Sequence, residues 1–275
     1  MRSIVQLING MPASDGAGVQ LSRIIGQPAL NMLDPFLLLD SFSSDDPEDY
    51  IAGFPPHPHR GFETVTYLLE GKMRHKDNAG HEGVIESGGI QWMTAGKGIV
   101  HSEMPEQENG LLSGFQLWVN LPAEHKMDQP TYQEISKAGI PVETRNGGVV
   151  IRVITGVTSE GTEGPVVQPL TEPLYLDVSL PEGQVFSENI TNGHNAFIYV
   201  IEGNVTVGDK SATTSELAIL SDGAEVSITA IGNDARFLLI AGKPLNEPVA
   251  RGGPFVMNTK EEIQQAFNDY QQGLF

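Results

Sequence analysis

A long-range internal repeat constrains the fold of this chain more than any other feature. Residues 63–77, "ETVTYLLEGKMRHKD", match residues 195–209, "NAFIYVIEGNVTVGD", at an offset of 132. Each copy has the pattern of a strand, a Glu-Gly turn and a second strand. A further similarity, between "SGGIQWMTA" and "SDGAEVSITA", pairs Gly88 with Gly223 at an offset of 135. The chain is therefore predicted to be a duplicated β-barrel.

Strand patterns recur at short intervals along the rest of the chain. Short runs of Val, Ile, Leu, Tyr and Phe lie between turn residues, which are plentiful because the chain has 31 Gly and 18 Pro. Such a density of strands is typical of a barrel or a sandwich. The expected strands are Phe36–Leu39, Thr64–Leu69, Gly83–Glu86, Ile90–Thr94, Gly114–Asn120, Val149–Thr155, Leu174–Leu180, Phe197–Ile201, Leu217–Leu220, Glu225–Thr229 and Arg236–Ile240.

One helix is predicted, at the C-terminal end. In "NTKEEIQQAFNDYQQG", Thr259 and Glu262 stand in capping-box positions and Gly273 closes the segment. We expect it to act as a lid or a docking helix. The Pro- and Gly-rich stretch "SKAGIPVETRNGG" marks the expected boundary between two domains, residues 1–142 and residues 143–275.

Charge and composition exclude several classes of protein. The 35 acidic and 16 basic side chains give a net charge of -19, which opposes contact with nucleic-acid backbones and anionic membranes. The absence of cysteine removes disulfides and thiolate chemistry. The apolar run in "MRSIVQLING" is too short for a signal peptide, and no stretch approaches the roughly 20 apolar residues of a membrane span. A soluble, cytoplasmic protein is expected.

Two pairs of metal-ligand residue types stand in the first copy of the repeat. His57 and His59 lie in "PPHPHRGFETVTYLLEG", and His101 and Glu103 lie in "GIVHSEMP". Side chains two residues apart in a strand share a face, so two such pairs on neighbouring strands could converge on a divalent metal ion. Three imidazoles and one carboxylate would leave coordination positions open for a ligand. Glu63 would share the face of His57 and His59 if that strand is regular, so strand parity leaves the choice of carboxylate open.

The second copy of the repeat provides an internal control, because a residue that the barrel itself requires should occur in both copies. At the offsets of 132 and 135, the positions that correspond to His57, His59, His101 and Glu103 hold Asn189, Thr191, Arg236 and Leu238. The ligand types are retained in the first copy alone, which predicts one metal per chain, in the N-terminal barrel.

The remaining histidines lack this pattern. His75 and His81 flank the turn "KDNAG", while His125 and His194 lie in polar loops. A single histidine is more often hydrogen-bonded or solvated than a metal ligand. We expect these four side chains to be solvated.

The ligand motifs resemble those of a known superfamily. The HxH segment with its Glu and Gly, followed by "AGKGIVHSE", resembles the two metal motifs of cupins, with Ala95 in place of the usual proline. A finer resemblance is to the pirin family. It rests on "DGAGVQLSRIIG", "DPFLLLD", "HPHRGFETVTYLLEG", "QWMTAGKGIVHSEMP", "GFQLWVNLP" and "GPFVMNTKEEIQQA", which together span nearly the whole chain.

This resemblance implies an all-β bicupin with two tandem jelly-roll barrels and a short C-terminal helix. It implies a mononuclear metal centre in the N-terminal barrel, with Fe(II) as the expected ion and Zn, Mn, Ni, Co or Cu as alternatives, and a degenerate C-terminal barrel. The implied ligands are His57, His59, His101 and Glu103. Many other cupins use the carboxylate at the position of Glu63, which here is assigned a supporting role.

The resemblance leaves two functions open. One is a quercetin 2,3-dioxygenase-type oxidoreductase that opens a flavonol with O2, with Glu103 as catalytic base. The other is a metal-dependent regulator that binds a transcription factor or a metabolic enzyme, for which the acidic chain favours a basic partner. Retention of the ligands in one barrel argues against a purely structural cupin. A monomer with no nucleic-acid or membrane partner is expected, and flat apolar walls for a flavonol could come from Phe54, Phe62, Trp92, Met93, Phe115 and Trp118.

Overall fold

Paired β-sheets account for most of the chain. The computed structural model describes residues 1–275 as 24 strands, four 3-10 helices and one α-helix. They form two compact units: residues 1–10, 28–35 and 138–244 make one, and residues 11–27, 36–137 and 245–275 make the other. Unlike the predicted ranges 1–142 and 143–275, these units are discontinuous. The difference arises because the first strand pairs within the later barrel, while Arg60 of the earlier barrel donates to Asp269 of the C-terminal helix and pairs with Phe255.

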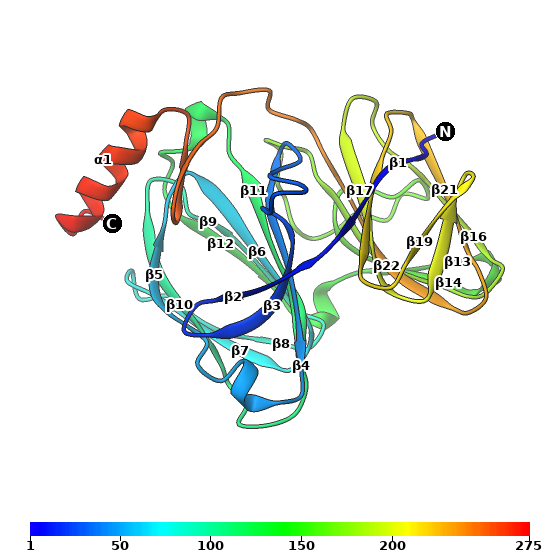
Figure 1. The fold of residues 1–275 in the computed structure, drawn as a ribbon, viewed down its shortest axis with the longest axis horizontal. Coiled ribbons are helices and arrows are strands. Elements are labelled where there is room, and N and C mark those ends of the chain that lie inside the picture. Colours follow the sequence, from blue (N-terminus) through cyan, green and yellow to red (C-terminus); the bar gives the residue numbers. More distant parts are fainter. The chain divides into compact units, whose positions relative to one another are not determined.

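The unit that holds the candidate ligands consists of two sheets (Figure 1). The seven-stranded sheet has the order β12 (Thr131–Ile135), β9 (Ile90–Thr94), β6 (Phe62–Glu70), β11 (Leu112–Asn120), β4 (Phe36–Ser44), β3 (Val19–Ile25), β2 (Met11–Asp15). The four-stranded sheet has the order β5 (Phe54–His59), β10 (Ile99–Pro105), β7 (Lys72–Asp77), β8 (Glu82–Glu86). Met73 and Ile85 of the smaller sheet pack with Leu21, Phe42 and Leu68 of the larger one, so the apolar core lies between the two sheets.

The other unit repeats this arrangement. Its seven-stranded sheet has the order β1 (Ile4–Asn9), β20 (Glu216–Leu220), β17 (Asn195–Glu202), β22 (Ala235–Gly242), β15 (Leu174–Leu180), β14 (Val149–Thr155), β13 (Val142–Arg145). Its four-stranded sheet has the order β16 (Val185–Asn189), β21 (Glu225–Ala230), β18 (Asn204–Val207), β19 (Lys210–Thr213). Phe186 and Phe237, one from each sheet, meet edge to face at 5.7 Å in a continuous apolar core.

The matching strand orders confirm the duplication and correct one part of the predicted alignment. β6 corresponds to β17 at the predicted offset of 132, because Tyr67 and Tyr199 hold the same place beside β9 and β20. The segment "SDGAEVSITA", however, ends in β21, which corresponds to β10 and not to β9. The offset of 135 is therefore wrong. Similar Gly and Ala spacing at two different turns produced that match.

All of the predicted strands are present, and the C-terminal helix α1 (Lys260–Gln271) has the predicted capping box. Thr259 accepts from the Glu262 backbone N–H at 3.2 Å, and the Glu262 carboxylate accepts from the Thr259 N–H at 2.9 Å. The helix packs on the hairpin of β23 (Ala250–Gly252) and β24 (Phe255–Met257). The 3-10 helices span Pro47–Asp49, Ala123–His125, Lys137–Gly139 and Asn146–Gly148. No helix has the length and apolarity required to cross a bilayer.

Candidate metal centre

The first pair of histidines lies on a strand of its own. β5 ends at His59, and the chain then turns through Gly61 into β6, which belongs to the other sheet. Gly61 has a φ of +86°, and a Cβ there would lie 2.0 Å from the carbonyl oxygen of Val256, so the turn requires glycine. The expectation that His57, His59 and Glu63 lie on one strand is thus corrected. β5 pairs antiparallel with β10, which places His101 directly opposite His57.

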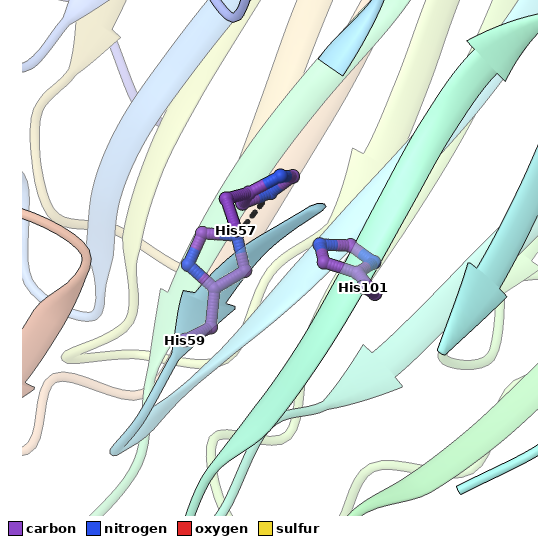
Figure 2. Close-up of side chains that lie close together, drawn as sticks. All are labelled: His57, His59 and His101. Atoms are coloured by element: carbon purple, nitrogen blue, oxygen red, sulfur yellow. Dashed lines mark hydrogen bonds between the residues drawn. The ribbon is translucent and has the colours of Figure 1, made fainter. Parts of the chain in front are cut away.

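The three imidazoles converge (Figure 2). The Nε2 atoms of His57 and His59 are 3.0 Å apart, and the ring of His101 lies 4.5 Å from that of His57 and 5.1 Å from that of His59. Adjacent ligands at about 2.1 Å from an octahedral ion are about 3.0 Å from each other. The Nδ1–H of His57 donates to the carbonyl of Pro55 at 2.8 Å, which leaves a lone pair on Nε2 for a metal.

Burial favours the neutral form, which a metal requires, for two of these imidazoles, His59 and His101. Desolvation lowers the pKa of His59 from 6.5 to about 3, with a further lowering by His57 and a partial offset by the Pro254 backbone. Desolvation likewise lowers the pKa of His101 well below 6.5. Neither ring nitrogen of His101 has a hydrogen-bond partner, although the side chain is completely buried. A buried imidazole without a partner is costly, and a metal ion would satisfy it, so the residues present fit a metal centre.

Glu103 lies beside this cluster. Its Oε2 is 4.0 Å from Nε2 of His101, and its Oε1 is 2.9 Å from the Thr66 hydroxyl. Desolvation raises the pKa of this buried carboxyl, while His57 and Thr66 act in the opposite direction. The tight group of ligand atoms consists of the three histidines alone, so coordination by Glu103 stays a prediction.

Glu63 occupies a different environment. It lies on β6, three residues before Thr66, so the two side chains point to opposite faces of that strand. The Thr66 hydroxyl reaches Glu103, whereas Glu63 accepts from the hydroxyl of Thr94 at 2.8 Å. The predicted sharing of one strand face by Glu63, His57 and His59 does not hold, because the turn at Gly61 places Glu63 on a different strand.

A cavity of about 670 Å³ opens onto the cluster. His57, His59 and Glu103 line it together with Phe54 and Trp118. The other candidates for apolar walls, Phe62, Trp92, Met93 and Phe115, are buried and do not line this cavity. Sequence reasoning did not find Arg23, Asp40, Thr66, Gln116 and Arg251, which also line it. Gln116 lies opposite Thr66 on the neighbouring strand β11, so the two side chains share a face. Knowing that these strands pair would have indicated Gln116.

Two of the histidines expected to be solvated are buried. His75 is 1% exposed and His194 is 8% exposed, whereas His81 and His125 are partly exposed. His75 is buried because it faces inward from β7, where it stands opposite Glu103 of β10. The turn pattern around residue 78 did not reveal this orientation.

The second barrel has lost the cluster at the matching positions. The two barrels can be aligned through one equivalent strand pair: Met73 lies opposite Pro105, and its counterpart Val205 lies opposite Ala230. Counting along the strands from there, the pair His101 and His57 corresponds to the pair Val226 and Glu188. By the same pairing His59 and Glu103 correspond to Ile190 and Ile228, so the counterparts differ from Asn189, Thr191, Arg236 and Leu238. Glu188 is buried and paired with Arg145 at 2.6 Å. The predicted asymmetry between the barrels holds, with different residues.

Two tandem barrels, one with a cluster of three convergent histidines, define a bicupin. The family models for "Pirin" and "Pirin C-terminal cupin domain" match residues 18–119 and 175–275. A pirin-like protein of Caulobacter vibrioides is 54% identical over 275 residues, covering 100% of this chain and 99% of that protein. The chain belongs to the pirin family.

Solved structures agree with this assignment. Quercetin 2,3-dioxygenase from Acinetobacter baumannii has a TM-score of 0.92 and 37% identity, covering 100% of this chain and 98% of that one. The bacterial pirin YhhW from Escherichia coli, in a complex with nickel(II), has a TM-score of 0.67 and 22% identity, covering 89% of this chain and 99% of that one. At that identity, the likeness to YhhW concerns the fold alone.

The depressed histidine pKa values predict acid sensitivity of the metal-free protein. His59 titrates near 6.5 when unfolded and near 3 when folded, so its stabilising contribution is complete above pH 6.5 and is lost as the pH falls towards 3. Between pH 7 and pH 5, His59 alone should cost about 2 kcal/mol of unfolding free energy. Urea unfolding at both pH values measures this. His59→Gln should lose that part of the pH dependence, and an identical pH dependence in both proteins would contradict the prediction.

Proposed function

We propose that this protein is a mononuclear metal dioxygenase of the quercetin 2,3-dioxygenase type, with His57, His59 and His101 as metal ligands and Glu103 as a fourth ligand or catalytic base. The observation that carries the proposal is the cluster of three convergent imidazoles, two of them on the wall of a cavity of about 670 Å³. A bound metal would supply Lewis acidity and open coordination positions. The name of the Acinetobacter structure supports the choice of reaction.

The cavity suits a flat, polyhydroxylated aromatic molecule. Its volume lies within the range of about 300–1,000 Å³ that is usual for small-molecule sites. Phe54 and Trp118 offer aromatic surface, while Gln116 and the Arg23–Asp40 pair, joined at 2.7 Å, offer hydrogen-bonding groups for hydroxyls. These residues would bind and orient a flavonol with its 3-hydroxyl towards Glu103.

Glu103 is suited to move the proton of that hydroxyl. Thr66 lies against Oε1, so Oε2, on the side of His101, is the oxygen available to accept the proton. Burial raises the pKa of the Glu103 carboxyl. A general base is most effective when its pKa lies near the working pH, so this shift favours the role of a base. Both atoms of O2 then enter the ring-opened ester and the 3-carbon leaves as carbon monoxide, so no reductant is needed. The buried walls exclude water from the deprotonated flavonol.

Turnover by protein loaded anaerobically with Fe(II) tests the proposal. We expect loss of the flavonol absorbance band, equimolar consumption of O2 and equimolar release of carbon monoxide. A second candidate function, a metal-dependent regulator, is favoured by the net charge of -19, which suits a basic protein partner. Iron-loaded protein that leaves quercetin unchanged would favour this second function.

The identity of the carboxylate ligand gives a matched prediction. Glu103→Gln should weaken Fe(II) affinity by at least tenfold, because the charged oxygen beside His101 is removed while the side-chain volume is kept. Glu63→Gln should leave the affinity within about twofold, because Glu63 bonds to Thr94 on the other face of β6. Competition against a chromophoric chelator measures both variants. Iron release by Glu63→Gln alone would show that the more general cupin pattern applies.

A further inference from the structure

A second group of metal-ligand side chains lies in the same barrel as the three-histidine cluster. It contains His75 on β7, His81 in the turn after β7, and Glu134 on β12. Their ligand atoms all lie within 4.8 Å of one another. Oε1 of Glu134 is 2.5 Å from Nε2 of His75 and 2.7 Å from Nε2 of His81. None of these residues belongs to the proposed catalytic centre.

Hydrogen bonding alone does not account for this cluster. His81 and the amide of Gln91 both donate to Oε1 of Glu134, at 2.7 and 2.9 Å. Nε2 of His75 contacts the same oxygen at 2.5 Å, although its ring N–H is poorly directed along that contact, and Nδ1 of His75 has no partner. The His75 side chain is 1% exposed, so this buried imidazole shares one carboxylate oxygen with His81 and Gln91 and keeps one nitrogen without a partner.

The surroundings leave space beside Nε2 of His75. Gly83 stands opposite His75 on β8, and a Cβ at Gly83 would lie 2.7 Å from Nε2 of His75 and 3.1 Å from Oε2 of Glu134. The absence of a side chain at Gly83 therefore keeps open the space that both ligand groups face. The ring of Tyr132 stacks on His81 at 4.3 Å and fixes its orientation.

We propose that His75, His81 and Glu134 form a second binding site for a divalent transition metal such as Zn(II). Two imidazoles and one carboxylate are a ligand set that zinc takes with water in the remaining position. Solvent can reach the site, because the side chains of His81 and Glu134 are 39% and 34% exposed. The nitrogen–oxygen contacts of 2.5 and 2.7 Å must lengthen to about 3.0–3.4 Å around an ion. The partly exposed His81 and Glu134 can make that movement.

Metal stoichiometry tests this site independently of catalysis. The full-length protein is stripped with a chelator, and Zn(II) binding is measured by equilibrium dialysis in a His57→Ala/His101→Ala background, which removes the first cluster. We expect two zinc ions in the wild type, one in this background, and none after addition of Glu134→Gln. Adding Gly83→Ala should weaken the remaining site at least tenfold, because its Cβ fills the space beside His75. Circular dichroism of the metal-free variants checks that they fold.

His125→Gln in the same background is the matched control, since His125 lies 2.7 Å from Asp128 but belongs to no cluster of three ligands. It should retain the one zinc ion. Zinc should also raise the melting temperature of the background protein, and Glu134→Gln should remove that rise. A background protein that binds no zinc, or whose zinc is unaffected by both Glu134→Gln and Gly83→Ala, would overturn the proposal. Neither result depends on whether the wild type cleaves quercetin.

Discussion

His101→Ala is expected to lower flavonol turnover by about 10³-fold or more. His101 supplies one of the three convergent imidazoles, and both of its ring nitrogens lack any other partner. Removing it takes away a proposed ligand and leaves a void beside the rings of His57 and His59. Loss of a metal centre removes several kcal/mol of transition-state stabilisation, and each 1.4 kcal/mol is a factor of ten in rate. Quercetin absorbance and carbon monoxide release measure the effect, with iron content determined on the same samples.

His125→Ala is the control for this experiment, because His125 is partly exposed and pairs with Asp128 at the surface. It should keep both iron and activity. If iron-loaded wild type turns over no faster than His101→Ala, the dioxygenase function fails and the regulator becomes the better account. If His101→Ala retains stoichiometric iron at wild-type affinity, the assignment of the ligand is wrong.

Arg145→Ala should destabilise the second barrel by about 3–5 kcal/mol. Arg145 donates to Glu188 and Glu143, at 2.6 Å each, and all three side chains are at least 90% buried. Removal of the cation leaves two carboxylates without their charge partner in the barrel, and breaking a buried pair in this way is among the costliest single changes. Urea unfolding at pH 7 measures the loss.

An exposed ion pair provides the comparison. Lys72 and Glu86 lie 2.8 Å apart, but their side chains are 54% and 66% exposed, so Lys72→Ala should change stability far less than Arg145→Ala. Comparable losses for Arg145→Ala and Lys72→Ala would show that the buried network does not hold the second barrel together.

The strands and the terminal helix were predictable because they rest on local signals. The duplication was predictable because the same local signals recur in the same order along the chain. Alternation of apolar residues, Glu-Gly turns and the Thr259–Glu262 capping box each act over a few residues, so a short stretch of sequence is enough to recognise them. The repeat offset of 132 was correct because residues 63–77 and 195–209 keep the same strand, turn and strand. The offset of 135 failed because short Gly and Ala patterns recur at turns that are not equivalent.

Within the site, the residue types and their spacing indicated the three histidines. The surroundings of the two carboxylates, Glu63 and Glu103, could be found only from the folded structure. If residues 57–63 formed one strand, Glu63 would share a face with His57 and His59. The turn at Gly61 instead takes the chain to the other sheet, so that conclusion fails. Thr66 marks the face of β6 on which Glu103 lies. Such relations depend on which strands become neighbours.

By itself, the sequence determined that this protein is a bicupin of two unequal barrels, with a group of histidines in the first alone as candidate ligands. Only the tertiary structure decided that His75 is buried against Glu134, some 59 residues away in sequence, and that Glu188 replaces His57 in the second barrel. The physical reason is that side-chain burial and pairing are set by contacts between distant strands. Local sequence patterns specify each strand and turn, but they carry little information about which side chains meet across two sheets.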